Sequence, residues 1–325
     1  MPLPSRALAR LAVLVLALAA PLAASADDYP NRPITVLVGF PPGGSTDAAM
    51  RILQDPMAQA LGQSIIIDNR GGAGGTLAAA MAAKAKPDGY TLLYTVNASL
   101  TMNMYMQKNF PFDSKTAFEP IGLASDVVLM LAVNSKLPVK TVQELVDYAR
   151  KNPGKLSYGS AGVGSGHHIC GELLKQKTGI DIVHVPYRGG GPATQDLVAG
   201  NIQVAFGTLP ALLPHVASGS IRIIASAEKG RVPGFPDIPA INETIPGVIN
   251  IGWSGMLAPA GTPKPVIEKV HAAMTAAVKM PDVADKMKTQ GLIARTATPD
   301  EFRKLLVAEI DYWGKVVPSI GIKPE

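Results

Sequence analysis

The sequence predicts an α/β fold built as two lobes, and three observations support this prediction. From residue 34 onward, short β-branched runs alternate with alanine- and leucine-rich helical patterns, which is typical of parallel strands joined by crossover helices. After an irregular stretch at residues 97–119, the same series repeats. A proline-rich passage at residues 232–246 then precedes a last apolar run, so the chain leaves one lobe, builds a second and returns. Hinged lobes of this kind close around small ligands.

The first lobe opens with a near-continuous apolar run, as expected for a strand covered on both faces. Its predicted elements form two βαβ units: a strand at 34–40, a helix between 49 and 61, a strand at 64–68, a helix at 76–84, a turn at 87–89 and a strand at 91–95. Asp55-Pro56 lies inside the first helix, where proline removes a backbone hydrogen bond, so we expect a kink there.

The second lobe repeats the plan. Its predicted elements are a strand near 127–133, a helix after Thr141, a strand at 156–158, a helix at 167–177, a strand at 182–185, a helix from Pro192 and a strand at 202–206. An apolar run at 253–259 and two or three helices end the chain. We therefore expect residues 27–127 and 251–325 to form one lobe and residues 128–250 the other, each a mainly parallel sheet flanked by helices, with two crossing strands between them.

The N-terminus has the pattern of an export signal. Arg6 and Arg10 flank an apolar stretch that ends in the small-residue sequence Ala24-Ser25-Ala26, which predicts cleavage after Ala26. Pro21 interrupts the stretch well short of the roughly 20 apolar residues that span a bilayer, and the cleavage point lacks the cysteine of a lipid anchor. The sequence therefore predicts a protein free in the periplasm.

Charge and cysteine content exclude several classes. Loss of Arg6 and Arg10 with the signal lowers the net charge from +5 to +3, and the basic residues are scattered without interleaved aromatics, so we expect no nucleic-acid binding. The single cysteine, Cys170, forms no internal disulfide and is expected to be a small buried residue.

Two glycine-rich turns, at residues 41–47 and 159–166, each follow an apolar run and each open onto a helical pattern. The first N–H groups of a helix lack intrahelical partners and lie at the positive end of its dipole. Glycine lets a ligand approach this backbone, and serine or threonine adds a hydroxyl. The two turns therefore predict a carboxylate site made by both lobes.

Several side chains beside these turns have two interpretations. Asn97 and Thr208 follow strands and should point to the cleft, or else cap a turn. Asp47 is suited to a ligand ammonium group, but we favour its structural role in the first helical turn. His168, or else His167, is a candidate donor to a ligand carboxylate. The remaining histidines supply no spaced partner, so we expect neither a metal nor a cofactor.

Taken in order, the motifs resemble the Bug or TctC family, the periplasmic substrate-binding proteins of tripartite tricarboxylate transporters. The matching blocks are 29–34, 40–47, 69–75, 87–92, 158–165, 185–193, 258–263 and 321–324. The resemblance implies a type II-like periplasmic binding protein that captures a small carboxylate, such as a di- or tricarboxylate, an acidic amino acid or an aromatic carboxylate. It also implies delivery to a permease of one large and one small membrane subunit.

The same resemblance assigns the ligand contacts to the two turns. The assigned residues are Gly43, Gly44, Ser45 and Thr46 in the first turn, and Ser160, Gly162, Gly164 and Ser165 in the second. The chain departs from the family at Asp55-Pro56 and at the paired histidines 167–168. Met102, Met104 and Met106 alternate in a stretch that borders the cleft in the family, where they either face an aromatic ligand or, as we favour, pack the core.

Two other functions stay open at this point. A secreted hydrolase needs Gly-x-Ser-x-Gly, and the serines at 160, 165 and 254 each lack at least one of its two glycines, so we expect no enzyme. A receptor that feeds a sensor kinase is compatible with every residue named above. We expect a monomer in either case.

Overall fold

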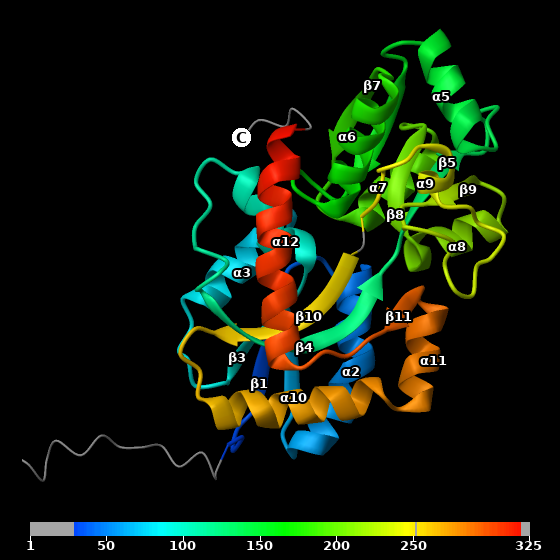
Figure 1. Cartoon of the computed structure of the whole chain (residues 1–325). Coiled ribbons are helices and arrows are strands. Elements are labelled where there is room, and N and C mark those ends of the chain that lie inside the picture. The colour runs from blue at the N-terminus through cyan, green and yellow to red at the C-terminus, as the bar shows by residue number, and fades with distance from the viewer. Residues whose placement is uncertain (1–28, 251, 320–325) are drawn as a thin grey trace, which may run out of the picture.

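The computed structural model describes residues 29–250 and 252–319, which form two sheets, each with helices on both faces, stacked one above the other (Figure 1). This confirms the predicted α/β class. The signal segment, its cleavage site and the motif at 321–324 lie outside the described residues. Within these residues, no helix has the length and apolar character needed to cross a membrane.

The first sheet has six strands in the order β11-β4-β10-β3-β1-β2. Their bounds are β1 (Ile34–Val38), β2 (Ile65–Asn69), β3 (Thr91–Val96), β4 (Phe118–Val127), β10 (Gly252–Pro259) and β11 (Leu292–Ala294). One face packs on α2 (Ser45–Leu61), α10 (Lys264–Val278) and α11 (Pro281–Thr289). The other packs on α3 (Thr76–Ala83) and on α12 (Pro299–Ser319).

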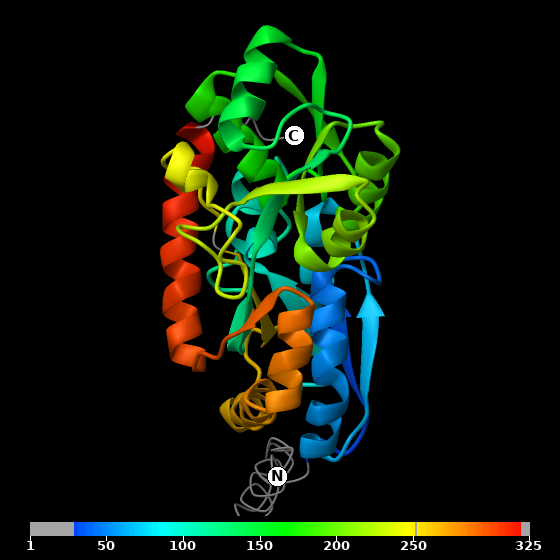
Figure 2. The same ribbon diagram turned by 90° about the vertical axis from the view of Figure 1, so that its right-hand side faces the viewer.

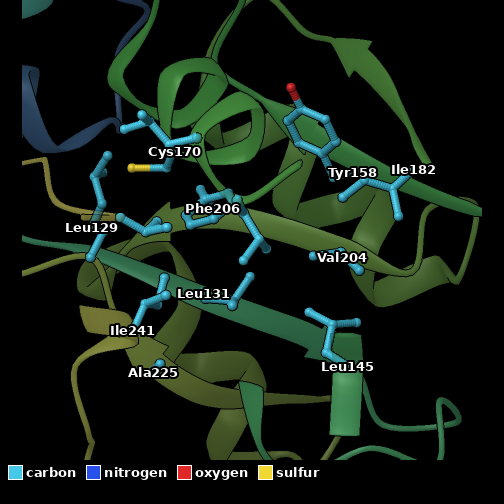
Figure 3. Close-up of a cluster of buried hydrophobic side chains, with 14 of the residues drawn as sticks. Leu129, Leu131, Leu145, Tyr158, Cys170, Ile182, Val204, Phe206, Ala225 and Ile241 are labelled. Carbon is cyan, nitrogen blue, oxygen red and sulfur yellow. The ribbon is translucent and has the colours of Figure 1, made fainter. Parts of the chain in front are cut away.

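The second sheet has five strands in the order β7-β6-β8-β5-β9. They are β5 (Leu129–Asn134), β6 (Leu156–Ser160), β7 (Ile182–Pro186), β8 (Val204–Thr208) and β9 (Ile221–Ser226). One face carries α5 (Val142–Lys151), α6 (Gly166–Thr178) and α9 (Ile241–Thr244), and the other carries α7 (Gly190–Ala199) and α8 (Leu209–Ala217). Figure 3 shows the first of these apolar layers, with side chains of β5 and β8 gathered beside Cys170.

Both sheets are mixed rather than purely parallel. The βαβ strands pair in parallel, whereas β5 runs antiparallel to β8 and β9, and β10 runs antiparallel to β3 and β4. In each sheet the carboxyl ends of the parallel strands face the other lobe. A strand that enters the sheet from the other lobe therefore runs antiparallel to them. β4 ends at Val127 and β5 begins at Leu129, which makes this one of the two places where the chain changes sheet.

Several elements differ from the sequence-based expectations. The stretch predicted as irregular contains the short helices α4 (Asn97–Thr101) and η3 (Asn103–Tyr105) and the start of β4. α7 begins at Gly190 rather than at Pro192, and α8 and β9 had no predicted counterpart. α2 continues through Pro56 to Leu61, so the proline lies inside a single helix, and the kink expected there stays a prediction.

Helix α12 connects the cores of the two lobes. Phe302, Leu306 and Ile310 pack in the first lobe, whereas Trp313 and Val317 belong to the core of the second. Figure 2 shows the helix running along one side of both lobes. Met102 is fully buried in the same second-lobe core, which agrees with the packing role that we favoured. Met106 is buried in that core as well, but it also lines one of the cavities described below.

Candidate ligand-binding site

A cavity of about 160 Å³ lies where the carboxyl ends of the two sheets face each other. Both lobes and the returning chain line it. The first lobe contributes 40–46, 96–98 and Val127; the second contributes Leu129, Ala161, 165–167, 189–192, Thr208 and Ala211; the return contributes Asn250 and Gly252. None of these described lining residues is Asp, Glu, Lys or Arg, so any charge recognition here comes from the backbone.

The N-termini of α2, α6, α7 and α8 converge on this cavity. Gly44 and Gly189, the N-cap residues of α2 and α7, have no side chain to satisfy the first N–H groups of their helices. Ser165, the N-cap of α6, accepts a hydrogen bond from the N–H of His168 at 3.3 Å but leaves the earlier N–H groups of the helix uncapped. Several positive helix ends from opposite lobes therefore point at one space.

Asp47 supports the first turn from behind instead of lining the cavity. Its side chain is 2% exposed and accepts hydrogen bonds from the backbone N–H of Gly43, from Arg51 and from Asn69 at 2.8–3.0 Å. Burial works to raise the pKa of Asp47, but these hydrogen bonds outweigh it and hold the pKa below its usual value. The neighbouring residues Gly43–Thr46 all line the cavity.

The second turn is divided between the cavity and the protein interior. Ser165 lines the cavity, whereas Ser160 is fully buried outside it, with its hydroxyl 2.7 Å from Nε2 of His184. His168 is also buried; its Nδ1 accepts from the N–H of Gly164 at 3.3 Å, and its ring stacks on that of His184. Ser160 and His168 therefore shape the turn without facing the cavity.

Asn97 and Thr208 line the cavity from opposite lobes, as the strand-end argument predicted. Thr208 caps no helix N–H with its side chain. Asn97 is hydrogen-bonded to the carboxyl group of Glu309 on α12, to which Trp253 also donates from Nε1 at 3.0 Å. Burial raises the pKa of Glu309 to about 7, against these two hydrogen bonds. This contact ties the cavity wall to the helix that spans both lobes.

The Ser160–His184 pair does not make a nucleophile for the cavity. Neither residue lines it, and burial together with neighbouring His168 lowers the pKa of His184 to about 4. Across residues 29–250 and 252–319, no three His, Cys, Asp or Glu side chains come together as a metal site requires.

A second cavity of about 230 Å³ adjoins the first, since Phe40, Pro41 and Ala161 line both. Gly162 lies on its wall together with the 72–75 loop, Met106 and the exposed Arg188. Gly164 lines neither cavity and packs instead on Asn103 of the other lobe.

Sequence reasoning missed part of the cavity wall. Asn250 lies in an irregular passage without any motif, so no local signal marks it. The turn at 189–191 lies between a predicted strand and a predicted helix, but its place beside the first turn depends on the packing of the lobes. His167 was named only as the alternative to His168, and it is His167 that lines the cavity.

Comparison with known proteins gives consistent matches along the chain. The family model described as "Tripartite tricarboxylate transporter family receptor" matches residues 49–322. Protein BugT of Bordetella pertussis is 34% identical over 308 residues, which is 94% of each chain. The structure of R. palustris Rpa4515 with adipate is 33% identical with a TM-score of 0.88, and covers 92% of this chain and 100% of its own. MatC from Rhodopseudomonas palustris with bound malate is 32% identical with a TM-score of 0.84, and covers 89% and 100%.

Proposed function

The chain belongs to the tripartite tricarboxylate transporter receptor family, and we propose that it captures a small carboxylate between its lobes and delivers it to the membrane subunits of such a transporter. The observation that carries this proposal is the convergence of uncapped helix N-termini from both lobes on one cavity without charged side chains. A carboxylate placed there receives several N–H hydrogen bonds and the favourable end of each dipole. Two related proteins have structures with adipate and with malate, which supports the same ligand class.

For the contacts, we propose the backbone and hydroxyls of Gly44, Ser45 and Thr46 on the first lobe and the first N–H groups of α6 and α7 on the second. Asn97 and Thr208 would complete the wall. Asp47, Ser160 and His168 would position the turns instead of contacting the ligand, because their polar atoms are already bonded within the protein.

For the capture step, we propose that residues 27–127 with 251–325 and residues 128–250 move as two units about the crossings near 128 and 251. The C-terminal half of α12 packs on the second lobe, so it would shift across that surface as the lobes open. Ligand docked on α2 would then be enclosed by α6 and α7.

The first test is thermal unfolding of the mature protein, freed of ligand, with di- and tricarboxylates, acidic amino acids, aromatic carboxylates and the matching uncharged amides. A ligand at a hundred times its dissociation constant adds about 2.7 kcal/mol to the free energy of unfolding, which gives a clear shift in Tm. We expect a shift with one carboxylate class and none with its amides. Stabilisation by the amides as well would contradict anion recognition.

The variant Ser45→Asp separates ligand binding from folding. A carboxylate in the first turn of α2 suits the helix dipole, so we expect an unchanged Tm, but it repels a carboxylate ligand and should weaken binding at least tenfold. Gln143→Glu is the matched control, because it adds the same charge at an exposed position in the first turn of α5, outside the cavity lining. Equal affinities in the two variants would overturn the proposed contact.

The transport step needs a test in cells. Deletion of the gene should abolish uptake of the ligand identified above, and a plasmid copy should restore it. Intact uptake with loss of ligand-dependent transcription would instead indicate a receptor for a sensor kinase.

A further inference from the structure

Two residues that line the cavity each carry a buried hydrogen-bond acceptor without a partner among the described residues. The first is Oδ1 of Asn250, whose side chain is 2% exposed. The amide nitrogen of the same side chain lies against Gly166 on α6, and it is hydrogen-bonded to the thiol of Cys170. With the nitrogen held there, Oδ1 is left as a buried, unpartnered acceptor on a residue of the cavity wall.

The second acceptor is Nδ1 of His167, which is buried and unpartnered. Burial lowers the pKa of His167 to about 4, against a hydrogen bond to the backbone carbonyl of Phe206, so the ring is neutral at ordinary pH. A neutral imidazole has one N–H and one bare nitrogen. Because Nδ1 has no partner, the N–H toward Phe206 is on Nε2, and Nδ1 carries the lone pair.

Both acceptors lie at the N-terminus of α6. Asn250 packs on Gly166, which directly precedes His167, and the His167 ring in turn lies against Gly190 at the start of α7. A buried acceptor without a hydrogen bond destabilises the protein. The helix N-termini around the cavity supply N–H donors, which suit the oxygen atoms of a carboxylate, whereas these two acceptors require a donor. The ligand must therefore bring hydrogen-bond donors as well as its anionic acceptor group.

We propose that this receptor is built for a hydroxycarboxylate, with the carboxylate at the helix N-termini and a hydroxyl donating to Oδ1 of Asn250, to Nδ1 of His167, or to both when two hydroxyls are present. The inference rests on the proposed function of the cavity. An ammonium group would also donate, but no described lining residue carries a carboxylate to balance it, and the converging helix N-termini repel a cation. A ligand hydroxyl meets the same need without adding charge.

Cavity volume limits the size of this ligand. A protein cavity of about 150 Å³ holds a benzene molecule, so this cavity of about 160 Å³ suits an acid with roughly four to six carbons. Only one end of such a ligand would extend into the adjoining cavity.

The test is isothermal titration calorimetry of the mature protein with succinate, malate and tartrate, which share a four-carbon dicarboxylate skeleton with zero, one and two hydroxyls. Both enantiomers of malate and tartrate are included, as are the pairs propionate and lactate, and butyrate and 3-hydroxybutyrate. We expect the hydroxylated member of the binding series to bind about ten- to a hundredfold tighter than its parent. Equal affinities would overturn the inference while leaving carboxylate capture intact, whereas a failure of every carboxylate would overturn the proposed function itself.

Two variants assign the discrimination to these side chains. His167→Phe and Asn250→Leu each remove one acceptor at similar volume, so each should reduce the preference for the hydroxylated ligand over its parent acid to about threefold or less. His215→Phe, a histidine outside the cavity lining, is the control and should keep the full preference. If both variants weakened the binding of parent and hydroxylated acids equally, the two acceptors would not bind the ligand hydroxyl, and the inference would be wrong. Should Asn250→Leu fail to fold, His167→Phe decides alone.

Discussion

Gly164 is the point at which a single methyl group should interfere with contact between the lobes. Its φ is +79°, and a Cβ built there would lie 1.8 Å from Oδ1 of Asn103 in the first lobe. Real Cβ atoms do not approach closer than about 3.0 Å, so Gly164→Ala requires one of the two to move by more than 1 Å. The amide of Asn103 is fixed by hydrogen bonds from its Nδ2 to Ala73, Gly74 and Thr76 at 3.0–3.2 Å.

The cost of Gly164→Ala has two parts. Left-handed backbone costs a residue with a Cβ about 1–2 kcal/mol, whatever its surroundings. Relief of the clash requires either that Asn103 abandon buried hydrogen bonds, at about 1–3 kcal/mol, or that the lobes separate. If the lobes close around the ligand, the cost of relieving the clash reduces the free energy of ligand binding by the same amount, and affinity should fall about five- to 150-fold.

Gly179→Ala is the matched control. Gly179 has a φ of +69° at the C-terminus of α6 and no atom within 4 Å of its Cβ position, so it carries the backbone cost without the clash. Calorimetry with malate, succinate and adipate, together with the Tm of each variant, separates the two parts. Wild-type affinity in Gly164→Ala, with the same loss of Tm as Gly179→Ala, would refute the link between this contact and ligand capture.

Three further predictions concern the residues behind the cavity wall. Asp47→Ala should lower the free energy of unfolding by about 2 kcal/mol in urea titrations at pH 7 and weaken ligand binding, because the first turn loses the carboxylate that holds it. The difference in stability between wild type and variant should disappear only as the pH falls below about 3.8, and an unchanged ligand affinity would contradict this role of Asp47. Ser160→Ala should cost about 1 kcal/mol of stability through the lost contact with His184 but change affinity less than threefold, and a tenfold loss would mean that Ser160 contacts the ligand. The pKa of His167 is about 4 in the folded protein and near 6.5 in the unfolded chain. Between pH 7 and 4.5 the wild type should therefore lose about 2–3 kcal/mol more stability than His167→Phe. Equal losses of stability in the two proteins would show that the ring is not buried in its neutral form.

The sequence was sufficient for the fold class and for the existence of two glycine-rich turns at helix starts. Apolar runs such as Ile34–Val38 act locally, and this run forms the expected strand. The strand ends at Asn97 and Thr208 were also placed correctly at the cavity, since parallel strands direct their carboxyl ends to one edge.

The remaining features depend on contacts between distant segments. Whether Ser160 faces ligand or protein is decided by His184, which comes from the neighbouring strand β7. Asn250 joins the wall only because the returning chain packs on α6, and no pattern in the residues that follow the proline-rich passage marks it. α12 shows the same limit, because its periodicity predicts a helix but not that its two halves belong to different cores.

Recognition of a carboxylate by helix N-termini from both lobes is tested best by a crystal structure of the wild-type protein with the carboxylate that binds it most tightly. We expect carboxylate oxygens about 2.7–3.2 Å from backbone nitrogens at the start of α2 on one side and of α6 or α7 on the other, or joined to them by one bridging water. A ligand carboxylate paired instead with the side chain of Arg188 in the adjoining cavity, with the helix N-termini unoccupied, would contradict it.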